Sequence, residues 1–402
     1  LLENPSMDRN ALLVAGAASL AAVGLWCLTR RRGGQRTVSY QEVGALPPST
    51  GTAPPGVLVT GGTGFVGRCV LKHLAAGGGA GRRTIISFDS RAPPEGERVE
   101  GVLYVVGSLV DQGHLQRAMA GRGVRAVLHV AGIKSFVGTR LQDLLAVNVE
   151  GTRRVIAACK EMGVRSLVYT SSLTVALDAS PSAPPARNVN MTRDAPHTHT
   201  PLDNYAKSKM AAEKLVLEAN GAGLETVSLR PTAIYGPGDN AIFDQIKETF
   251  NTPTFGEAQH AWDWVSVSDV ARAHVCALEA LEQKRPEVAG HAFFVGQGET
   301  AVYRDVFMNI GNLIHMEGQQ CPSIPIPLAK VLARINVFIH SLTGLIAFHV
   351  SMTVASINFT QVNWSVDITL TTKCLGYTPE HPTTPETIRA MVKGQGLLLK
   401  GK

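Results

Sequence analysis

The chain has 402 residues, 45% hydrophobic and 17% charged, which is enough for one large domain or two ordinary ones. Its net charge of +6 comes from 38 Lys and Arg against 32 Asp and Glu, and about half of that excess lies before residue 37. No basic stripe interleaved with aromatic residues follows, so nucleic acid is not expected as a partner. The six Cys form no CxxC pair, so the sequence predicts neither a zinc site nor a disulfide framework.

The N-terminal region predicts a membrane anchor. Residues 11–29 carry no charge and could span about 28 Å as a helix at ~1.5 Å per residue, and "RRRGGQR" follows at once. Because Arg-rich flanks stay cytoplasmic, we expect 7–36 to be a membrane anchor with the following domain on the cytoplasmic side. A cleaved targeting peptide and a mitochondrial membrane are the alternatives. Pro and Gly at high density predict a linker over 37–55.

Apolar strands then alternate with helical patterns, which predicts an α/β, doubly wound parallel sheet. The expected strands are 56–61, 83–89, 99–108, 126–132, 166–172 and 225–231, and the expected helices are 65–76, 148–163 and 205–220. We expect this sheet to form a Rossmann domain over 56–235, followed by a smaller domain, mainly for substrate, over 236–395.

Glycines cluster between the first of these strands and its helix. Gly61, Gly64 and Gly67 have the spacing that allows a tight turn, close approach of a pyrophosphate and close helix packing. Asp89 ends the second strand, where a carboxylate accepts hydrogen bonds from the adenosine ribose and favours NAD over NADP. Arg91 follows and could partly accommodate a 2′-phosphate, so NADP stays open. An Asp in a polar turn is the plainer interpretation.

A tyrosine and a lysine stand four residues apart in "YAKSK", so a helix would place Tyr205 and Lys209 on one face. A free phenol, with a pKa of ~10, is a poor base at neutral pH, and a neighbouring ammonium would lower that pKa. The preceding strand ends in Ser171 and Ser172, whose hydroxyls could hold a substrate oxygen. Most such pairs lie on solvated helix faces, but their place in a nucleotide-binding domain favours catalysis.

Taken together, these motifs resemble the extended short-chain dehydrogenase/reductases, and within them the 3β-hydroxysteroid dehydrogenase and sterol-4α-carboxylate 3-dehydrogenase branch. The resemblance covers about residues 56–390. It rests on "VTGGTGFVG" (59–67), "NVEGT" (148–152), "YTSS" (169–172), "YAKSK" (205–209), "LRPTAIYGPGD" (229–239), "WDWVSVSDVARAHVCALEAL" (262–281) and "LGYTPEHP" (375–382). The segment 262–281 resembles the substrate-domain helix of the family.

The resemblance implies which residues bind the cofactor and which are catalytic. Catalysis would use Ser172, in preference to Ser171, with Tyr205 and Lys209. The implied cofactor contacts are Gly61, Thr63, Gly64, Phe65, Val66, Gly67, Asp89, Arg91, Ser108, Leu109, Ala131, Gly132, Tyr205, Lys209 and Pro231. The chain departs from the family at Ser108, where the family has Asp beside the adenine, although Asp111 follows.

The resemblance also implies a reaction. NAD+ would take a hydride from a 3β-carbinol carbon of a sterol or steroid, Tyr205 would take the proton, and a 4α-carboxylate could then leave as CO2. No metal is expected, and we assign "HTHT" (197–200) to a loop before the catalytic helix. The alternatives are a non-catalytic nucleotide-binding subunit of a membrane complex, as in respiratory complex I, and a reductase or epimerase of the same fold.

A second apolar stretch lies near the C-terminus. Residues 335–366 contain no Asp, Glu, Lys or Arg, but they include His, Ser, Thr and Asn. They predict buried helices of the substrate domain, whereas the resemblance to the steroid branch implies a segment that dips into membrane lipid beside the substrate entrance. With the N-terminal anchor, the resemblance makes the endoplasmic reticulum membrane, with a cytoplasmic catalytic domain, the expected location. The expected partners are therefore an apolar small molecule and membrane lipid, with a homodimer or a membrane-complex partner left open.

Overall fold

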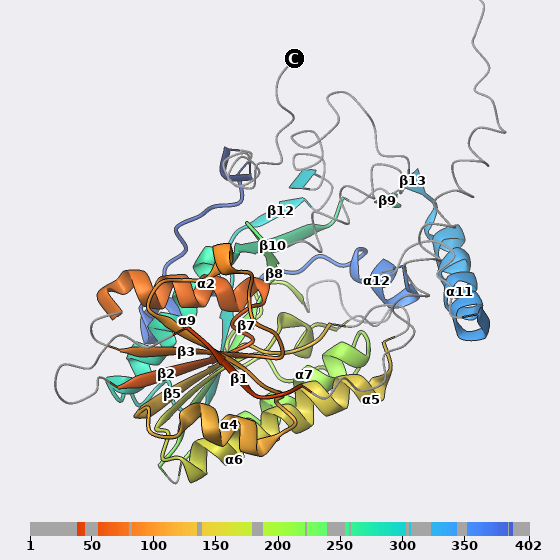
Figure 1. Ribbon diagram of the computed structural model, residues 1–402. Coiled ribbons are helices and arrows are strands. Elements are labelled where there is room, and N and C mark those ends of the chain that lie inside the picture. The colour runs from red at the N-terminus through yellow and green to blue at the C-terminus, as the bar shows by residue number, and fades with distance from the viewer. Residues whose placement is uncertain are drawn as a thin grey trace, which may run out of the picture.

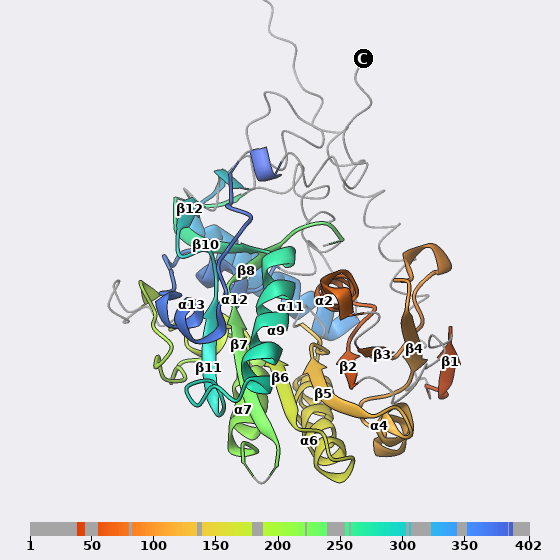
Figure 2. The ribbon, with the colours of Figure 1, turned by 90° about the vertical axis from the view of Figure 1, so that its left-hand side faces the viewer.

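The protein is described by a computed structural model (Figures 1 and 2). The described residues are 38–44, 55–79, 83–134, 139–178, 188–221, 223–238, 254–256, 259–302, 305–306, 323–343, 352–384 and 386–388. The expected anchor and Arg-rich flank over 7–36 lie outside these residues. Within the described part of the chain, no helix combines the length and apolar character that a membrane crossing requires.

The fold is built on an eight-stranded sheet with the order β1-β4-β3-β2-β5-β6-β7-β11. Its strands are β1 (Gln41–Val43), β2 (Gly56–Thr60), β3 (Thr84–Asp89), β4 (Val102–Val106), β5 (Val124–His129), β6 (Ser166–Thr170), β7 (Glu225–Pro231) and β11 (His291–Val295). All neighbours pair in parallel except β1, which is antiparallel to β4. The strand order reverses between β2 and β5, where sheets of this class bind ligands at the carboxyl ends of the strands.

Helices cover both faces of the sheet, as Figure 1 shows. The covering helices are α2 (Phe65–Leu74), α4 (Gln112–Met119), α6 (Gly151–Glu161), α7 (Asn204–Glu218) and α9 (Val267–Glu282). Alternate residues of a strand enter different cores: Val57 and Val59 pack with α2 and α9, and Leu58 packs with α4, α6 and α7. The predicted doubly wound parallel sheet is therefore confirmed.

A smaller lobe carries the remaining elements. Its strands are β8 (Ala233–Tyr235), β10 (Ala261–Ser266) and β12 (Thr300–Val302) in one sheet, and β9 (Thr254–Phe255) with β13 (Ser323–Ile324) in another. Its helices are α11 (Ile326–Thr343), α12 (Val354–Phe359) and α13 (Thr369–Leu375). Short turns complete the chain: η1 (Ala75–Gly79), η2 (Glu95–Glu97), α5 (Leu141–Leu144), η3 (Leu145–Glu150) and η4 (Leu173–Val175). An aromatic cluster of Trp262, Trp264, Phe359 and Trp364 fills the lobe.

The structure corrects two of the expected boundaries. Strand β1 lies inside the expected linker 37–55, because Gln41–Val43 pairs with the edge strand β4. Helix α9, expected in the substrate domain, packs against α2 on the main sheet, and β11 pairs with β7. The dinucleotide fold therefore includes segments well beyond residue 235.

Helix α11 has an unusual distribution of side chains. Its buried residues are Ala329, Ala333 and Asn336, all small or polar. Its large apolar side chains face outward, at 41–69% exposure, and they are Leu328, Val331, Ile335, Val337, Phe338 and Leu342. For this part of 335–366, the expectation of ordinary buried core is wrong.

Candidate active site

The glycine loop between β2 and α2 has the geometry of a phosphate cradle. Gly61 adopts a φ of +71°, and its N–H donates to Phe88 O at 2.8 Å. A Cβ on Gly67 would lie 2.1 Å from Gly61 O, so only glycine permits this packing of helix and loop. Gly64 caps α2 with no side-chain hydrogen bond, which leaves N–H groups at the helix start for an anion. Thr63 Oγ1 is buried and, within the described residues, has no hydrogen-bond partner.

Asp89 lies directly beside this loop. Its Oδ2 accepts a hydrogen bond from Thr63 N at 3.1 Å, and its Oδ1 accepts one from Ser90 N at 2.7 Å. Oδ1 also accepts a hydrogen bond from Ser90 Oγ at 3.2 Å, so Oδ2 is the oxygen that keeps a free lone pair for a ribose hydroxyl. Arg91 is exposed. The residues at the loop therefore fit a dinucleotide.

The segment after β4 differs from the expectation for the adenine end. Ser108 N donates to His114 Nδ1 at 3.1 Å, and Ser108 Oγ accepts from Val110 N at 3.4 Å. Asp111 accepts a hydrogen bond from His114 N at 3.1 Å and caps α4. Asp111 is thus explained as a helix cap, and it does not replace the carboxylate that the family has at position 108.

The other expected cofactor residues lie around the same edge of the sheet. Phe65 and Val66 form the first turn of α2, and Pro231 is the last residue of β7. Leu109 packs against Gly151 after β4, and Ala131 and Gly132 follow β5. The loops after β2, β4, β5 and β7 therefore meet where a nucleotide is expected.

A chain of buried hydrogen bonds holds the loop after β5. His129 Nδ1 lies 2.7 Å from Thr60 Oγ1, and its Nε2 lies 2.9 Å from Thr152 Oγ1. Thr152 Oγ1 donates to Asn148 O at 2.6 Å, so it accepts from His129, and the imidazole is neutral with its proton on Nε2. Burial lowers the pKa of His129 to about 3, in agreement with this neutral form.

Asn148 connects this chain to the catalytic helix. Its side chain accepts from Ile133 N at 2.9 Å and donates to Ile133 O at 3.0 Å and to Ser208 Oγ at 2.9 Å. Ser208 Oγ in turn donates to Tyr205 O at 2.8 Å. Asn148 was expected only as part of the motif "NVEGT" (148–152), but its side chain bridges the loop after β5 to the first turn of α7.

Ser172 and Tyr205 lie close together at the carboxyl ends of the strands. Thr174 donates both its N–H, at 3.3 Å, and its hydroxyl, at 3.0 Å, to Ser172 Oγ. The Ser172 proton is therefore left for another acceptor, and the side chains of Ser172 and Tyr205 form a hydrogen bond. Ser171 Oγ is buried and, among the described residues, has no hydrogen-bond partner. This arrangement supports the choice of Ser172 over Ser171.

Lys209 lies one helical turn after Tyr205 and is only 4% exposed. Its Nζ donates to Thr170 O at 2.7 Å and lies 4.9 Å from the centre of the Tyr169 ring. Burial lowers the pKa of Lys209 to about 8, and the carboxylate of Glu213 acts in the opposite direction. Lys209 is therefore mostly protonated at neutral pH, although its pKa lies only about one pH unit above neutrality.

The acidity of Tyr205 differs from the prediction. We expected Lys209 to lower the pKa of the phenol below 10, but desolvation raises the pKa of Tyr205 to about 12. The hydrogen bond with Ser172 lowers the pKa and is outweighed, and Asp203 raises it further. The structure therefore presents a protonated phenol at neutral pH.

The most substantial residue that sequence analysis missed is Glu213, which is fully buried behind Lys209. It forms an ion pair with Arg230 and accepts hydrogen bonds from Ser228 and His197. The four-residue spacing of Tyr205, Lys209 and Glu213 on one helix could have indicated it. His197, from "HTHT", thus lies against a carboxylate, and within the described residues no cluster of metal-ligating side chains occurs.

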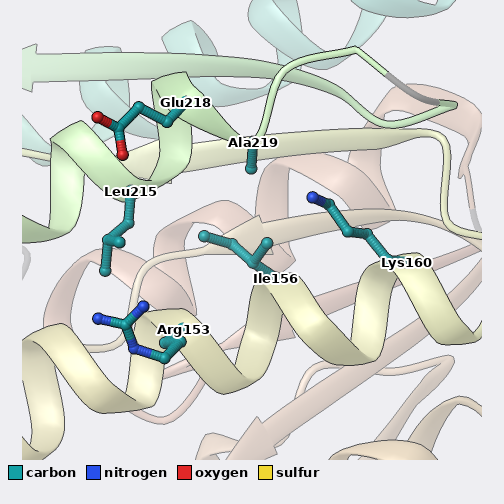
Figure 3. A pocket seen from close by; sticks show the side chains of 6 residues that line it. All are labelled: Arg153, Ile156, Lys160, Leu215, Glu218 and Ala219. Carbon is teal, nitrogen blue, oxygen red and sulfur yellow. The ribbon is translucent and has the colours of Figure 1, made fainter.

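A shallow surface depression of about 180 Å³ lies elsewhere, between α6 and α7. Figure 3 shows its lining, with Arg153, Ile156 and Lys160 from α6 and Leu215, Glu218 and Ala219 from α7. It contains none of the expected site residues.

Comparisons with known proteins agree with this arrangement. The chain is 30% identical to short-chain dehydrogenase/reductase family 42E member 1 of Mus musculus, over 81% of this chain and 84% of that protein. It is 30% identical to sterol-4-alpha-carboxylate 3-dehydrogenase erg26, decarboxylating, of Schizosaccharomyces pombe, over 61% of this chain and 70% of that protein. The fold resembles Thermus thermophilus UDP-glucose 4-epimerase in complex with NAD, with a TM-score of 0.61 and 23% identity over 85% of this chain and 99% of that one. Residues 58–326 match the 3-beta hydroxysteroid dehydrogenase/isomerase family, and the chain belongs to this family of oxidoreductases.

Proposed function

We propose that the protein is an NAD-dependent dehydrogenase that oxidises the 3β-hydroxyl of a sterol or steroid. The observation that carries the proposal is that Ser172, Tyr205 and Lys209 lie together beside a glycine loop flanked by Asp89. The family membership and the sterol named for the Schizosaccharomyces pombe relative support this substrate class.

The residues would divide the reaction between them. Ser172 holds the substrate oxygen, because its hydroxyl proton is not used by Thr174. Tyr205 exchanges the proton with that oxygen, and Lys209 supports the charge that develops on the phenol. NAD+, held by the glycine loop and Asp89, supplies the acceptor of the hydride. In a sterol 4α-carboxylate, the 3-ketone so formed is a β-keto acid, which loses CO2 readily because the enolate is stabilised.

The direction of the reaction should depend on pH. Since the pKa of Tyr205 is about 12, the phenol is protonated at neutral pH and is ready to donate its proton to a ketone. We therefore infer that ketone reduction is the second candidate activity. Alcohol oxidation should become faster as pH rises, until Lys209, with a pKa of about 8, loses its charge.

The decisive experiment replaces Tyr205 with Phe, which keeps the ring and removes the hydroxyl. With NAD+ and a panel of 3β-hydroxysterols, including 4α-carboxylates, Tyr205→Phe should lower kcat by ~10²–10⁴-fold. Nucleotide affinity should stay near that of the parent, because the glycine loop and Asp89 are unchanged. Lys209→Met should reduce both.

Chromatography coupled to mass spectrometry separates the candidates, because oxidation and decarboxylation change the mass of the sterol, whereas epimerisation changes only its retention time. Tyr40→Phe is the matched control, since that hydroxyl binds Glu42 at the sheet edge. Parental kcat in Tyr205→Phe on the true substrate would remove the mechanism.

We further propose that the protein works at the endoplasmic reticulum membrane and contacts lipid through α11. The outward apolar side chains of this helix support the proposal. No Asp or Glu occurs between Glu317 and Asp367, and α11 carries Lys330 and Arg334, so an anionic lipid surface would not be repelled. An apolar substrate dissolved in the bilayer would then be close to the enzyme.

We also propose a homodimer, formed through the surface of α6 and α7. Helices α6 and α7 present Arg153 and Lys160 beside Glu218 around the depression of Figure 3. In a two-fold pair, the acidic group of one protomer could face the basic groups of its partner. Sedimentation at several salt concentrations tests this, since a strictly monomeric protein at low salt would contradict it.

A further inference from the structure

Helix α7 carries a third polar residue on its catalytic face. Tyr205, Lys209 and Glu213 follow one another at four-residue intervals, which stacks their side chains along the helix. Glu213 is fully buried, and Lys209 is nearly so. Buried acidic side chains are rarely found without hydrogen-bond or ion-pair partners. A buried Glu and a buried Lys next to a reacting phenol are therefore an unusual combination.

The Glu213 carboxylate is held from three directions. From β7, Arg230 Nη2 and Nε donate to its Oε1 at 2.7 and 3.1 Å, and Ser228 Oγ donates to Oε2 at 2.8 Å. From the loop before α7, His197 Nε2 lies 2.7 Å from Oε1. Although burial would raise the pKa of Glu213, these hydrogen bonds and the charge of Arg230 lower it to about 2. The carboxylate is therefore ionised throughout the working pH range.

The charges around this carboxylate leave one positive charge for the site. Lys209 faces it from the same helix, Arg230 from β7, His197 from the loop, and the neutral phenol of Tyr169 from β6. Arg230 is the ion-pair partner of Glu213 from β7, and Lys209 is the second cation that faces this carboxylate, one turn away on α7. Among the described residues, the other contacts of Lys209 Nζ are uncharged, namely the carbonyl oxygen of Thr170 and the ring of Tyr169. An ionised group one turn away in a low-dielectric interior acts strongly on such a lysine.

We propose that Glu213 is a positioning residue, whose buried carboxylate keeps Lys209 positively charged beside Tyr205. This proposal rests on the proposed function, because it takes Tyr205 and Lys209 to be catalytic. Arg230 and Ser228 fix the carboxylate so that its field stays directed at the lysine, and His197 covers it on the solvent side, at 29% side-chain exposure. A purely structural ion pair would join α7 to β7 equally well without affecting the lysine.

The test measures the ionisation of Lys209 without any substrate. Competitive labelling of the full chain with acetic anhydride across a pH series, read by peptide mass spectrometry, reports the pH at which each lysine becomes a free amine. Glu213→Gln keeps the shape and most hydrogen bonds but removes the charge. Lys209 should then become reactive about one pH unit lower, which means about tenfold more free amine at a given pH below that point.

The matched control is Glu218→Gln on the same helix. Glu218 is 59% exposed and lies 3.8 Å from Lys214, so its loss should leave the labelling of Lys209 unchanged. The pH profile of kcat/KM gives a second measurement, in which the alkaline decline should start earlier in Glu213→Gln only. Identical labelling of Lys209 in Glu213→Gln and the parent would overturn the proposal.

A second variant covers the case in which Glu213→Gln fails to fold, because it leaves Arg230 without its anion. Glu213→Gln combined with Arg230→Met removes both charges, and Lys209 should again become reactive at lower pH. Unchanged labelling in that folded double variant would also overturn the proposal. Since labelling needs no turnover, failure of the sterol panel would count against the proposed function and not against the role of Glu213.

Discussion

Asp89 is the single residue on which the choice of nucleotide should depend. Its carboxylate is positioned by Thr63 N and Ser90 N beside the glycine loop, where it can accept from a ribose diol and repel a 2′-phosphate. Asp89→Ala should weaken NAD(H) binding and so reduce the ratio of NAD(H) affinity to NADP(H) affinity. The ratio should fall by about tenfold if one charge-assisted hydrogen bond is lost. Titration of both nucleotides by protein fluorescence measures the ratio.

Asp143→Ala is the control for this prediction, because Asp143 pairs with Arg140 on the surface. It should leave both affinities unchanged. Equal binding of NAD(H) and NADP(H) by the unmutated protein would contradict the assignment, and Arg91 would then be the residue to replace.

At this scale, the sequence predicted those residues whose roles follow from local spacing. Tyr205 and Lys209 lie on one helix, and Gly61 and Gly67 lie in one loop-to-helix segment, so their relation is contained in a few consecutive residues. Arg230 contacts Glu213 only because β7 packs beside α7, and spacing cannot reveal that. The raised pKa of Tyr205 was missed for a similar reason, since desolvation depends on everything that surrounds the phenol.

Among the elements, α11 makes the most direct prediction. Leu328, Val331, Ile335, Phe338 and Leu342 recur at three- and four-residue intervals on its outer face. Phe338→Ser with Leu342→Ser should reduce binding to vesicles that contain anionic lipid by up to about a thousandfold, because about 2 kcal/mol of apolar burial is lost for each side chain. Cosedimentation with the vesicles measures the bound fraction.

The control removes two exposed apolar side chains that are not part of α11. Val110 lies between β4 and α4 and Leu141 in α5, at 43% and 39% exposure, and the control variant is Val110→Ser with Leu141→Ser. Vesicle binding should be unaffected by this pair. If both double variants bind as the parent does, α11 is not a lipid contact.

The elements that sequence analysis predicted correctly are those with a long buried pattern. Strands β2, β3, β5 and β6 are apolar along most of their length because helices cover both faces. Strand β1 is only "QEV", with two exposed polar residues, so its pairing with β4 left no pattern to detect. For α9, the apolar pattern was visible, but the helix against which it packs was not.

For the whole molecule, buried titratable groups make stability depend on pH. Burial lowers the pKa of His129 to about 3 and that of His274 to about 4. Below pH 6.5 both histidines therefore take up protons on unfolding, and the free energy of unfolding decreases as the pH decreases. Burial raises the pKa of Asp263 to about 7, so this carboxyl acts in the opposite direction between its ordinary 3.8 and 7. The net effect is about one proton, or ~1.4 kcal/mol per pH unit lost on acidification from about 6.5 toward 4.5.

Thermal unfolding followed by dye fluorescence should therefore show a midpoint that decreases between these two pH values. Asp263→Asn removes the opposing carboxyl, so the decrease should become about twice as steep even if the variant is less stable overall. A midpoint that rises on acidification would show that Asp263 outweighs the two histidines.

The interleaving of the two lobes has a consequence for how the chain acquires its structure. Strand β7 pairs with β11, 64 residues later in the register of Val227 with His291, and α9 supplies much of one core between them. As the ribosome releases the chain, β7 is an open edge and α2 lacks its partner helix until the small lobe has begun to emerge. Open edges and late, long-range parallel pairing favour aggregation and slow folding. Expression of residues up to 235 alone would therefore give an incomplete sheet, and the nascent full-length protein should depend on chaperones until β11 has been made.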